Sequence, residues 1–203
     1  MRSQEDQVWY HVDVNSAYLS WTAAYRVCIL GEDLDLRDIP SVIGGSEAER
    51  HGIVLAKSGS AKRYGIRTGE LKKYFPHVHQ YSIDEAFCRV EGTKGLWGTH
   101  TAFAHQLKEE IRRELGFTVN IGVSDCKLLA KMASEFQKPD QVHTLFTREI
   151  ERKMWPLPVS DLFWVGPATV RKLGALGIRT IGELAVMDLE LLKRHLKKQG
   201  EFI

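Results

Sequence analysis

The sequence has little of what marks secreted, zinc-binding or membrane-spanning proteins. Its 203 residues include three scattered cysteines without CxxC spacing, which argues against a disulfide framework or a zinc site. No apolar run approaches the length of a membrane span, and residues 1–7 lack the apolar core of a signal peptide. The net charge of +2 is too small to indicate nucleic-acid binding by itself. These absences predict a cytoplasmic protein without a membrane partner.

What the sequence does contain is a pair of adjacent carboxylates in an apolar stretch. Asp84 and Glu85 stand among Tyr81, Ile83 and Phe87, which are typical strand residues. Burying such a pair costs desolvation and like-charge repulsion unless a cation compensates it. Because adjacent strand residues face opposite ways, the two acids can share a metal site only at a strand end or hairpin. Two interpretations stay open, half of a divalent-metal site or a hairpin tip with two solvated acids.

A third acid, Asp13, stands near the end of a predicted buried strand over residues 8–14. Asn15 or Ser16 can then cap a helix that begins at Ala17. A carboxylate at such a corner can hold a metal while the free backbone N–H groups of the helix start face a phosphate. The alternative is an aspartate that simply caps the turn.

Hydrophobic periodicity predicts that strands and helices alternate as far as residue 145. Besides the strand at 8–14 and the hairpin around Asp84, the predicted strands are residues 39–43, 51–56, 117–123 and 141–145, and the predicted helices are 97–115 and 128–136. Lys108 is expected on the outer side of the first of these helices, and Ser124 or Asp125 at the cap of the second. The pattern predicts an α+β domain whose helices pack on one face of a sheet.

A domain boundary is predicted at residues 156–158, where Pro-Leu-Pro interrupts the chain and only short helices follow. Val165 and Gly166, with the proline after them, form a turn between two short helices that is typical of a helix-hairpin-helix. Such a turn exposes backbone N–H groups, which bind DNA phosphates regardless of sequence. Arg171 and Lys172 add cations nearby. The alternative is an ordinary helical turn.

Four stretches in this order resemble the Y-family, or UmuC-like, translesion DNA polymerases. They are residues 11–18, 81–87, 120–140 and 158–185, so the resemblance covers nearly the whole chain. It implies an α+β fold with a ferredoxin-like polymerase palm and a reduced fingers insertion, followed by a small all-α helix-hairpin-helix thumb. On this basis residues 1–155 form the palm, with partial fingers near 19–70, and residues 156–203 form the thumb.

The resemblance also implies template-directed addition of deoxynucleotides to a primer 3′ end, in translesion synthesis and DNA repair. Asp13, Asp84 and Glu85, with the Val14 carbonyl, would hold two Mg²⁺ ions, which prefer such hard oxygen ligands. The implied nucleotide-binding residues are Ser16, Ala17, Tyr18, Lys62 and Lys138, and the implied DNA-binding residues are Val165, Gly166, Arg171 and Lys172. The implied partners are primer–template DNA, deoxynucleoside triphosphates and a sliding clamp.

The sequence departs from the family pattern in four places. Gly59 stands where the family usually has a tyrosine that contacts the triphosphate, and Lys62 stands where many members have arginine. The join at residues 68–71 is shorter than usual, and the chain ends in the thumb, without the little finger and the usual C-terminal clamp motif. The leading hypothesis is a translesion-type DNA polymerase, and the alternative is a non-catalytic DNA-binding remnant of one.

Overall fold

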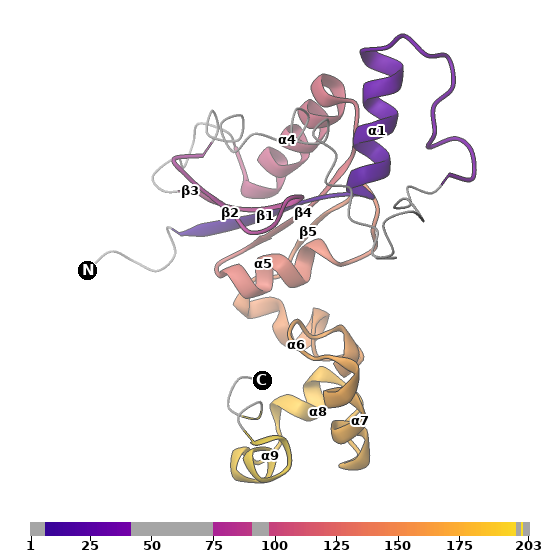
Figure 1. The fold of residues 1–203 in the computed structure, drawn as a ribbon. Coiled ribbons are helices and arrows are strands. Elements are labelled where there is room, and N and C mark those ends of the chain that lie inside the picture. Colours follow the sequence, from indigo (N-terminus) through magenta and orange to yellow (C-terminus); the bar gives the residue numbers. More distant parts are fainter. Residues whose placement is uncertain (1–6, 42–74, 91–97, 198–199, 201–203) are drawn as a thin grey trace. The chain divides into compact units, whose positions relative to one another are not determined.

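The computed structural model of this chain describes residues 7–41, 75–90, 98–197 and 200 (Figure 1). The chain divides into two compact units, Met1–Thr144 and Leu145–Ile203. The sequence put a boundary at residues 156–158, whereas the structure groups the residues just before it with the second unit. Trp155 explains the difference, because its carbonyl accepts a hydrogen bond from the Gly182 N–H of that unit (3.0 Å).

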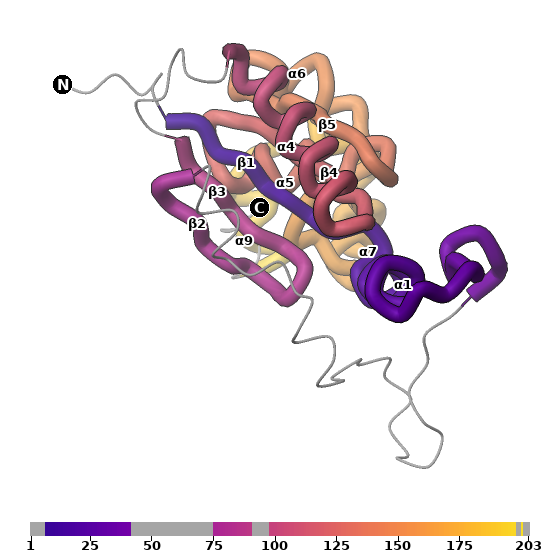
Figure 2. The backbone as a smooth tube through the Cα atoms, turned by 90° about the horizontal axis from the view of Figure 1, so that it is seen from above, coloured from indigo at the N-terminus to yellow at the C-terminus, as the bar shows by residue number. Residues whose placement is uncertain are grey.

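The first unit is built on a mixed sheet. Its described strands are β1 (Val8–Val14), β2 (His77–Gln80), β3 (Glu85–Val90), β4 (Val119–Ser124) and β5 (Val142–Thr144). Their order is β2-β3-β1-β4-β5, so β1 lies in the middle, antiparallel to β3 and β4 (Figure 2). β2 pairs antiparallel with β3, whereas β5 pairs parallel with β4. The predicted α+β class is confirmed.

Helices cover both faces of this sheet. α4 (His100–Leu115) lies on one side and α5 (Lys127–Ser134) on the other, while α1 (Ala17–Cys28) follows the end of β1 (Figure 1). Tyr10 of β1 packs against Phe103 of α4, with ring centroids 5.8 Å apart, and the next residue, His11, bonds Ser134 of α5 (2.8 Å). The prediction of helices on one face was wrong, because β1 is buried on both sides.

The hairpin of β2 and β3 also differs from expectation. Tyr81 and Ile83 lie in the connection between the two strands, and both side chains are exposed. Glu85 instead begins β3, which is the strand end that a shared acidic site requires. Residues 39–41 form no strand, consistent with the missing N–H of Pro40. The rest of the predicted 39–43 and 51–56 pair lies outside the described residues.

Two predictions about helix surfaces and ends were wrong as well. Lys108 of α4 is buried, because its ammonium binds the Asp140 carboxylate (2.9 Å) instead of solvent. Cys126, and neither Ser124 nor Asp125, is the cap residue of α5, and its side chain makes no capping bond. The Ser124 hydroxyl accepts a bond from the Cys126 N–H (3.4 Å), so it helps to shape the turn before the helix.

α5 packs onto β4 through Gly122, where there is no room for a side chain. A Cβ at Gly122 would lie 1.9 Å from the Ala130 carbonyl oxygen and 2.5 Å from the Ser134 nitrogen. Asn120, also on β4, is fully buried and donates to the Ser134 carbonyl (2.9 Å). These contacts hold the C-terminal half of α5 tightly against the sheet.

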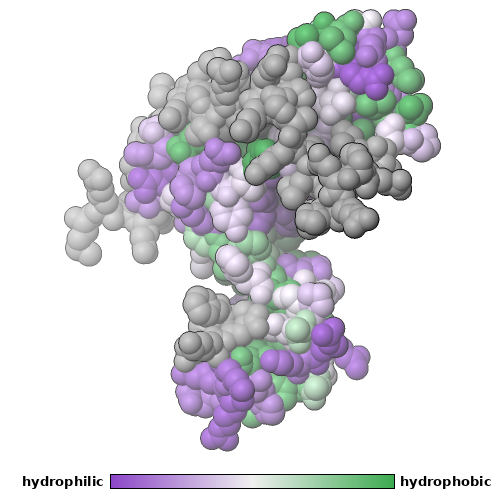
Figure 3. All heavy atoms as spheres, in the orientation of Figure 1, coloured by the Kyte–Doolittle hydropathy of each residue, from purple (hydrophilic) through white to green (hydrophobic). Residues whose placement is uncertain are grey.

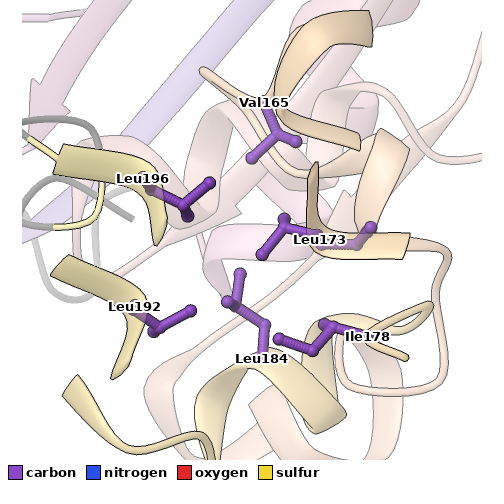
Figure 4. Close-up of a cluster of buried hydrophobic side chains, with 7 residues drawn as sticks. Val165, Leu173, Ile178, Leu184, Leu192 and Leu196 are labelled. Atoms are coloured by element: carbon purple, nitrogen blue, oxygen red, sulfur yellow. The ribbon is translucent and has the colours of Figure 1, made fainter. Parts of the chain in front are cut away.

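The second unit is helical throughout its described part. Its elements are η3 (Thr147–Glu149), α6 (Ile150–Lys153), η4 (Val159–Asp161), α7 (Pro167–Ala175), α8 (Ile181–Ala185) and α9 (Leu189–Leu196). Leu173, Leu184 and Leu192, one from each of the last three helices, meet in a shared core (Figure 4). Each such buried leucine contributes about 1.5–3 kcal/mol of transfer free energy. The predicted all-α unit is therefore confirmed, with an apolar core of its own.

The surface around α9 is mostly hydrophilic on the face seen in Figure 3. The last turn of α9 contains Lys193 and Arg194, and Lys193 pairs with Glu190 (3.0 Å). Within the residues that the structure describes, no helix has both the length and the apolar character needed to cross a bilayer.

Candidate active site

Two strand ends bring Asp13 and Glu85 together. Asp13 of β1 is the register partner of Glu85, the first residue of β3. The Val14 N–H donates to the Asp84 carbonyl (3.1 Å), which fixes the start of β3 beside the end of β1. Asp13 is buried and Glu85 is half-buried. The three acids singled out in the sequence are thus neighbours along the backbone at one end of the sheet.

The side chains of these acids separate into two groups. The Ser82 hydroxyl lies 2.6 Å from Asp84 Oδ1 and 3.1 Å from Glu85 Oε2, so Ser82 links the two adjacent acids. Among the described residues, the carboxylates that could hold one ion together are those of Asp13, Glu85 and Glu135, whose ligand oxygens lie within 4.8 Å of one another. Sequence reasoning missed Glu135, which follows α5. The immediate partner of the Asp84 side chain is therefore Ser82, whereas the Asp13 side chain lies with Glu85 and Glu135.

Two lysines partly neutralise this carboxylate cluster of Asp13, Glu85 and Glu135. The Lys138 ammonium binds Asp13 Oδ2 and lies 2.9 Å from Glu135 Oε2. The Lys131 ammonium binds Glu85 Oε1 and lies 3.5 Å from Glu135 Oε1. Three carboxylates therefore face two ammonium groups, which leaves one formal negative charge.

The pKa values of the cluster follow from burial and these ion pairs. Burial raises the pKa of Asp13, and the hydrogen bond from Lys138 offsets only part of the rise. Burial also favours a higher pKa for Glu135, but Lys138 and Lys131 outweigh it, so the net shift is downward. Burial lowers the pKa of Lys138, yet its bonds to Asp13 and Glu135 leave that pKa raised. Lys138 therefore stays charged between the two acids.

His11 lies beneath the cluster as a buried, neutral side chain. The Ser134 hydroxyl donates to the Lys131 carbonyl (2.7 Å), so its oxygen accepts from His11 Nδ1–H (2.8 Å). The other ring nitrogen, Nε2, then carries a lone pair and lies 3.8 Å from Glu85 Oε1. Burial, followed by the positive charge of Lys131, lowers the pKa of His11 to about 3. The sequence quoted His11 only as part of a motif, and nothing local indicated this position.

The start of α1 lies directly after this end of β1. Ser16 is the cap residue and adopts a left-handed conformation (φ 47°) without a side-chain capping bond. Asn15 instead donates to the Thr118 hydroxyl (3.1 Å). The first N–H groups of a helix have no partner within the helix, so those around Ala17 and Tyr18 are suited to a phosphate. Ala17 is buried, whereas Tyr18 is half-buried and packs edge-on against Trp21.

The remaining sequence-predicted residues lie elsewhere. Lys62 is outside the described residues. In the second unit, Gly166 caps α7, and a Cβ added to it would meet open space. Val165 is part of the hydrophobic core, and its N–H donates to the Leu162 carbonyl (3.0 Å), so that N–H is not available to a ligand. Arg171 and Lys172 are exposed on α7.

The carboxylate cluster fits a magnesium-type cation by the chemistry of its donors. Asp13, Glu85 and Glu135 offer oxygen atoms, the hard ligands that Mg²⁺ prefers. They lie close to one another, and Asp13 is buried, so a cation would offset both desolvation and mutual repulsion. The backbone of Asp84 lies beside this group, at the same end of the sheet.

Comparison with known proteins gives consistent similarities. Residues 69–135 match the family model of the impB/mucB/samB family (IMS). A DNA polymerase IV of Clostridium acetobutylicum is 48% identical over 230 aligned positions, which cover 97% of this chain and 57% of that protein. The alignment is longer than this chain of 203 residues, so the relative has internal residues without a counterpart here. The comparison does not locate these residues along the chain, so the short join at residues 68–71 stays a prediction.

Solved structures share the fold. The Dbh ternary complex is similar with a TM-score of 0.72 at 18% identity, over 96% of this chain and 65% of that one. A DinB family error prone DNA polymerase from Sulfolobus solfataricus has a TM-score of 0.71 at 19% identity, over 93% and 62%. The chain spans just over half the length of the curated relative described above. By sequence the chain is similar to UmuC-like, Y-family DNA polymerases, and it shares the fold of the solved structures.

Proposed function

We propose that this chain performs template-directed DNA synthesis of the translesion type, adding deoxynucleotides to a primer 3′ end. The observation that carries the proposal is the convergence of Asp13, Asp84 and Glu85 at one end of the sheet, in a chain 48% identical to a DNA polymerase IV. The first unit then corresponds to the palm with the beginning of the fingers, and the second unit to the thumb. In this proposal the internal residues that this chain lacks belong to the predicted short join at residues 68–71.

In this proposal Asp13, Asp84 and Glu85, with the Val14 carbonyl, hold two Mg²⁺ ions. Such ions supply activation of the primer hydroxyl and neutralisation of the triphosphate and leaving pyrophosphate. Asp84 would leave Ser82 and turn toward Asp13, which a side chain in a connecting segment can do. Fixed positions at the ends of β1 and β3 would orient the other two carboxylates.

The same end of the sheet offers a place for the incoming nucleotide. The backbone N–H groups at Ser16, Ala17 and Tyr18 would bind phosphates at the start of α1. Lys138 would move from Asp13 to the triphosphate, with Lys62 as a second phosphate contact. Tyr18, half-buried beside Trp21, would sterically exclude a ribose 2′-hydroxyl. Primer–template DNA and deoxynucleoside triphosphates are the partners in this reaction.

A second candidate function is DNA binding without catalysis. It is favoured by the second unit, which has its own core and presents the exposed Gly166 at the start of a nine-residue helix. The Gly166 N–H, which follows Val165 at the start of α7, would bind a DNA phosphate, supported by Arg171 and Lys172. Both functions use this surface, so only catalysis distinguishes them.

Primer extension with Mg²⁺ on an undamaged template tests the first proposal. We expect Asp13→Asn and Asp84→Ala to reduce incorporation at least about a hundredfold, because metal-held charge is a large part of transition-state stabilisation. Glu151→Gln, on α6 of the second unit, is the matched control and should leave the rate unchanged. Absence of incorporation by the unaltered chain, or full activity of Asp84→Ala, would refute the catalytic proposal.

A salt series of DNA binding tests the surface shared by both candidates. Gly166→Ala places a methyl group in front of the helix start without meeting any protein atom, so we expect about three- to tenfold weaker binding in a folded protein. Gly174→Ala, in open space on the same helix, is the control and should bind normally. Replacing Arg171 by Met should make the negative slope of log K against log salt shallower by about 0.9. Binding that ignores salt and Gly166 would exclude this surface.

A further inference from the structure

Glu135 occupies an unusual place in the carboxylate cluster, because each of its oxygens faces a different lysine. Oε2 lies 2.9 Å from the Lys138 ammonium, and Oε1 lies 3.5 Å from the Lys131 ammonium. Lys131 lies four residues before Glu135 in the sequence, and Lys138 lies three residues after it. Helical spacing alone can produce such pairs, and by itself it would indicate only a solvated ion network.

The other partner of each lysine makes this network different from a surface one. Lys138 also binds Asp13, and Lys131 also binds Glu85. Asp13 and Glu85 are the two carboxylates that the sheet fixes side by side. The ion pairs therefore run in one chain, from Asp13 through Lys138, Glu135 and Lys131 to Glu85. Among the ion pairs of the described residues, Glu135 joins the two halves of that chain.

A divalent cation and these ammonium groups would compete for the same oxygens. A cation between Asp13 and Glu85 repels Lys138 and Lys131 at short range, so both must move off those carboxylates. Asp13 and Glu85 belong to strands, and their side chains are 9% and 16% exposed, respectively. The Glu135 side chain is 46% exposed. Glu135 is thus the carboxylate with freedom to move outward together with the lysines.

We propose that Glu135 is a positioning residue that accepts Lys131 and Lys138 when a divalent cation takes Asp13 and Glu85. This inference rests on the proposed function, since it assigns a cation to those two acids. Without Glu135, Lys138 keeps Asp13 and Lys131 keeps Glu85 as its nearest carboxylate. The cation must then displace both ammonium groups without the Glu135 carboxylate to receive them. Glu135 therefore sets how readily the cation binds, and it contacts the lysines instead of the cation.

Binding of Mn²⁺ to the full chain, measured by the electron paramagnetic resonance of free Mn²⁺ without DNA or nucleotide, tests this role. We expect Glu135→Gln to weaken Mn²⁺ binding about fivefold to tenfold, as the loss of two partly exposed ion pairs predicts. Glu190→Gln removes a comparable pair with Lys193 (3.0 Å) in the second unit and should have no effect. Unweakened Mn²⁺ binding in Glu135→Gln would overturn the proposal.

A lysine-free background separates positioning from direct ligation. In a Lys131→Met/Lys138→Met background we expect Glu135→Gln to weaken Mn²⁺ binding only about twofold, the residual attraction between one carboxylate and the ion. A loss that persists at fivefold or more would identify Glu135 as a ligand and refute the positioning role. If Asp13→Asn leaves Mn²⁺ affinity unchanged, the cation site itself is absent, and the proposed catalytic function fails together with the role of Glu135.

Discussion

Replacing Gly122 by alanine should destabilise the first unit strongly. The new Cβ would lie 1.9 Å from the Ala130 carbonyl oxygen, whereas an ordinary contact begins near 3.4 Å, so α5 would have to retreat by about 1.5 Å. Both close atoms belong to the backbone and cannot rotate away. Overpacking of this kind costs about 1–3 kcal/mol and occasionally more. For a unit of this size, we expect the melting temperature to fall by roughly 5–10 °C.

Thermal unfolding followed by circular dichroism measures this effect, with Gly174→Ala as the matched control. Gly174 lies within α7, and a Cβ there would meet no atom within 4 Å. Alanine should therefore stabilise that helix by about 0.5–1 kcal/mol through its higher helix propensity. If Gly122→Ala melts within about 1 °C of the unaltered protein, the close packing of α5 on β4 is refuted.

Three further predictions test other parts of the fold. Asn120→Ala should cost about 2–4 kcal/mol in urea unfolding, because it removes the side-chain partner of the buried Ser134 carbonyl and of the part-buried Gln141 N–H. Iodoacetamide should modify the exposed Cys28 in the folded protein but reach Cys88 only after unfolding, since burial raises the pKa of the Cys88 thiol to about 12. Backbone N–H groups of Arg179 and Thr180 lower the pKa of Glu183, so the ionised Glu183 stabilises the second unit. This stabilisation should be lost as the pH falls below about 4.5. In a pH series of unfolding, Glu183→Gln should abolish that loss.

The sequence contained enough local information to predict the strands that carry the acids. The apolar run at residues 8–14 and the acid pair at Asp84 and Glu85 each signal a strand or its end within a few residues. The short helices after residue 158 were likewise visible from their glycines, prolines and caps. These features depend on neighbours along the chain, which is why pattern and propensity suffice for them.

Contacts between distant segments could not be predicted in the same way. Lys108 has the sequence context of a solvent-facing residue, and only the packing of α4 brings it to Asp140, 32 residues later. The mostly apolar sequence of β1 is compatible with a strand that is covered on both faces, yet the same sequence also suits a strand with one covered face. Glu135 shows the limit most clearly, because its spacing to two lysines is visible whereas the approach of those lysines to Asp13 and Glu85 is not.

The packing of α5 joins the stability of the first unit to its chemistry. Gly122 lets the helix approach β4, and the same stretch of helix carries Lys131, which binds Glu85, and Ser134, which holds His11. A helix displaced by about 1.5 Å would lose these contacts before the sheet itself changed. Gly122→Ala should therefore alter Mn²⁺ binding even at temperatures where the protein remains folded. Unchanged Mn²⁺ affinity in a folded Gly122→Ala protein would mean that Asp13 and Glu85 form the cation site from the strands alone, independently of the helix behind them.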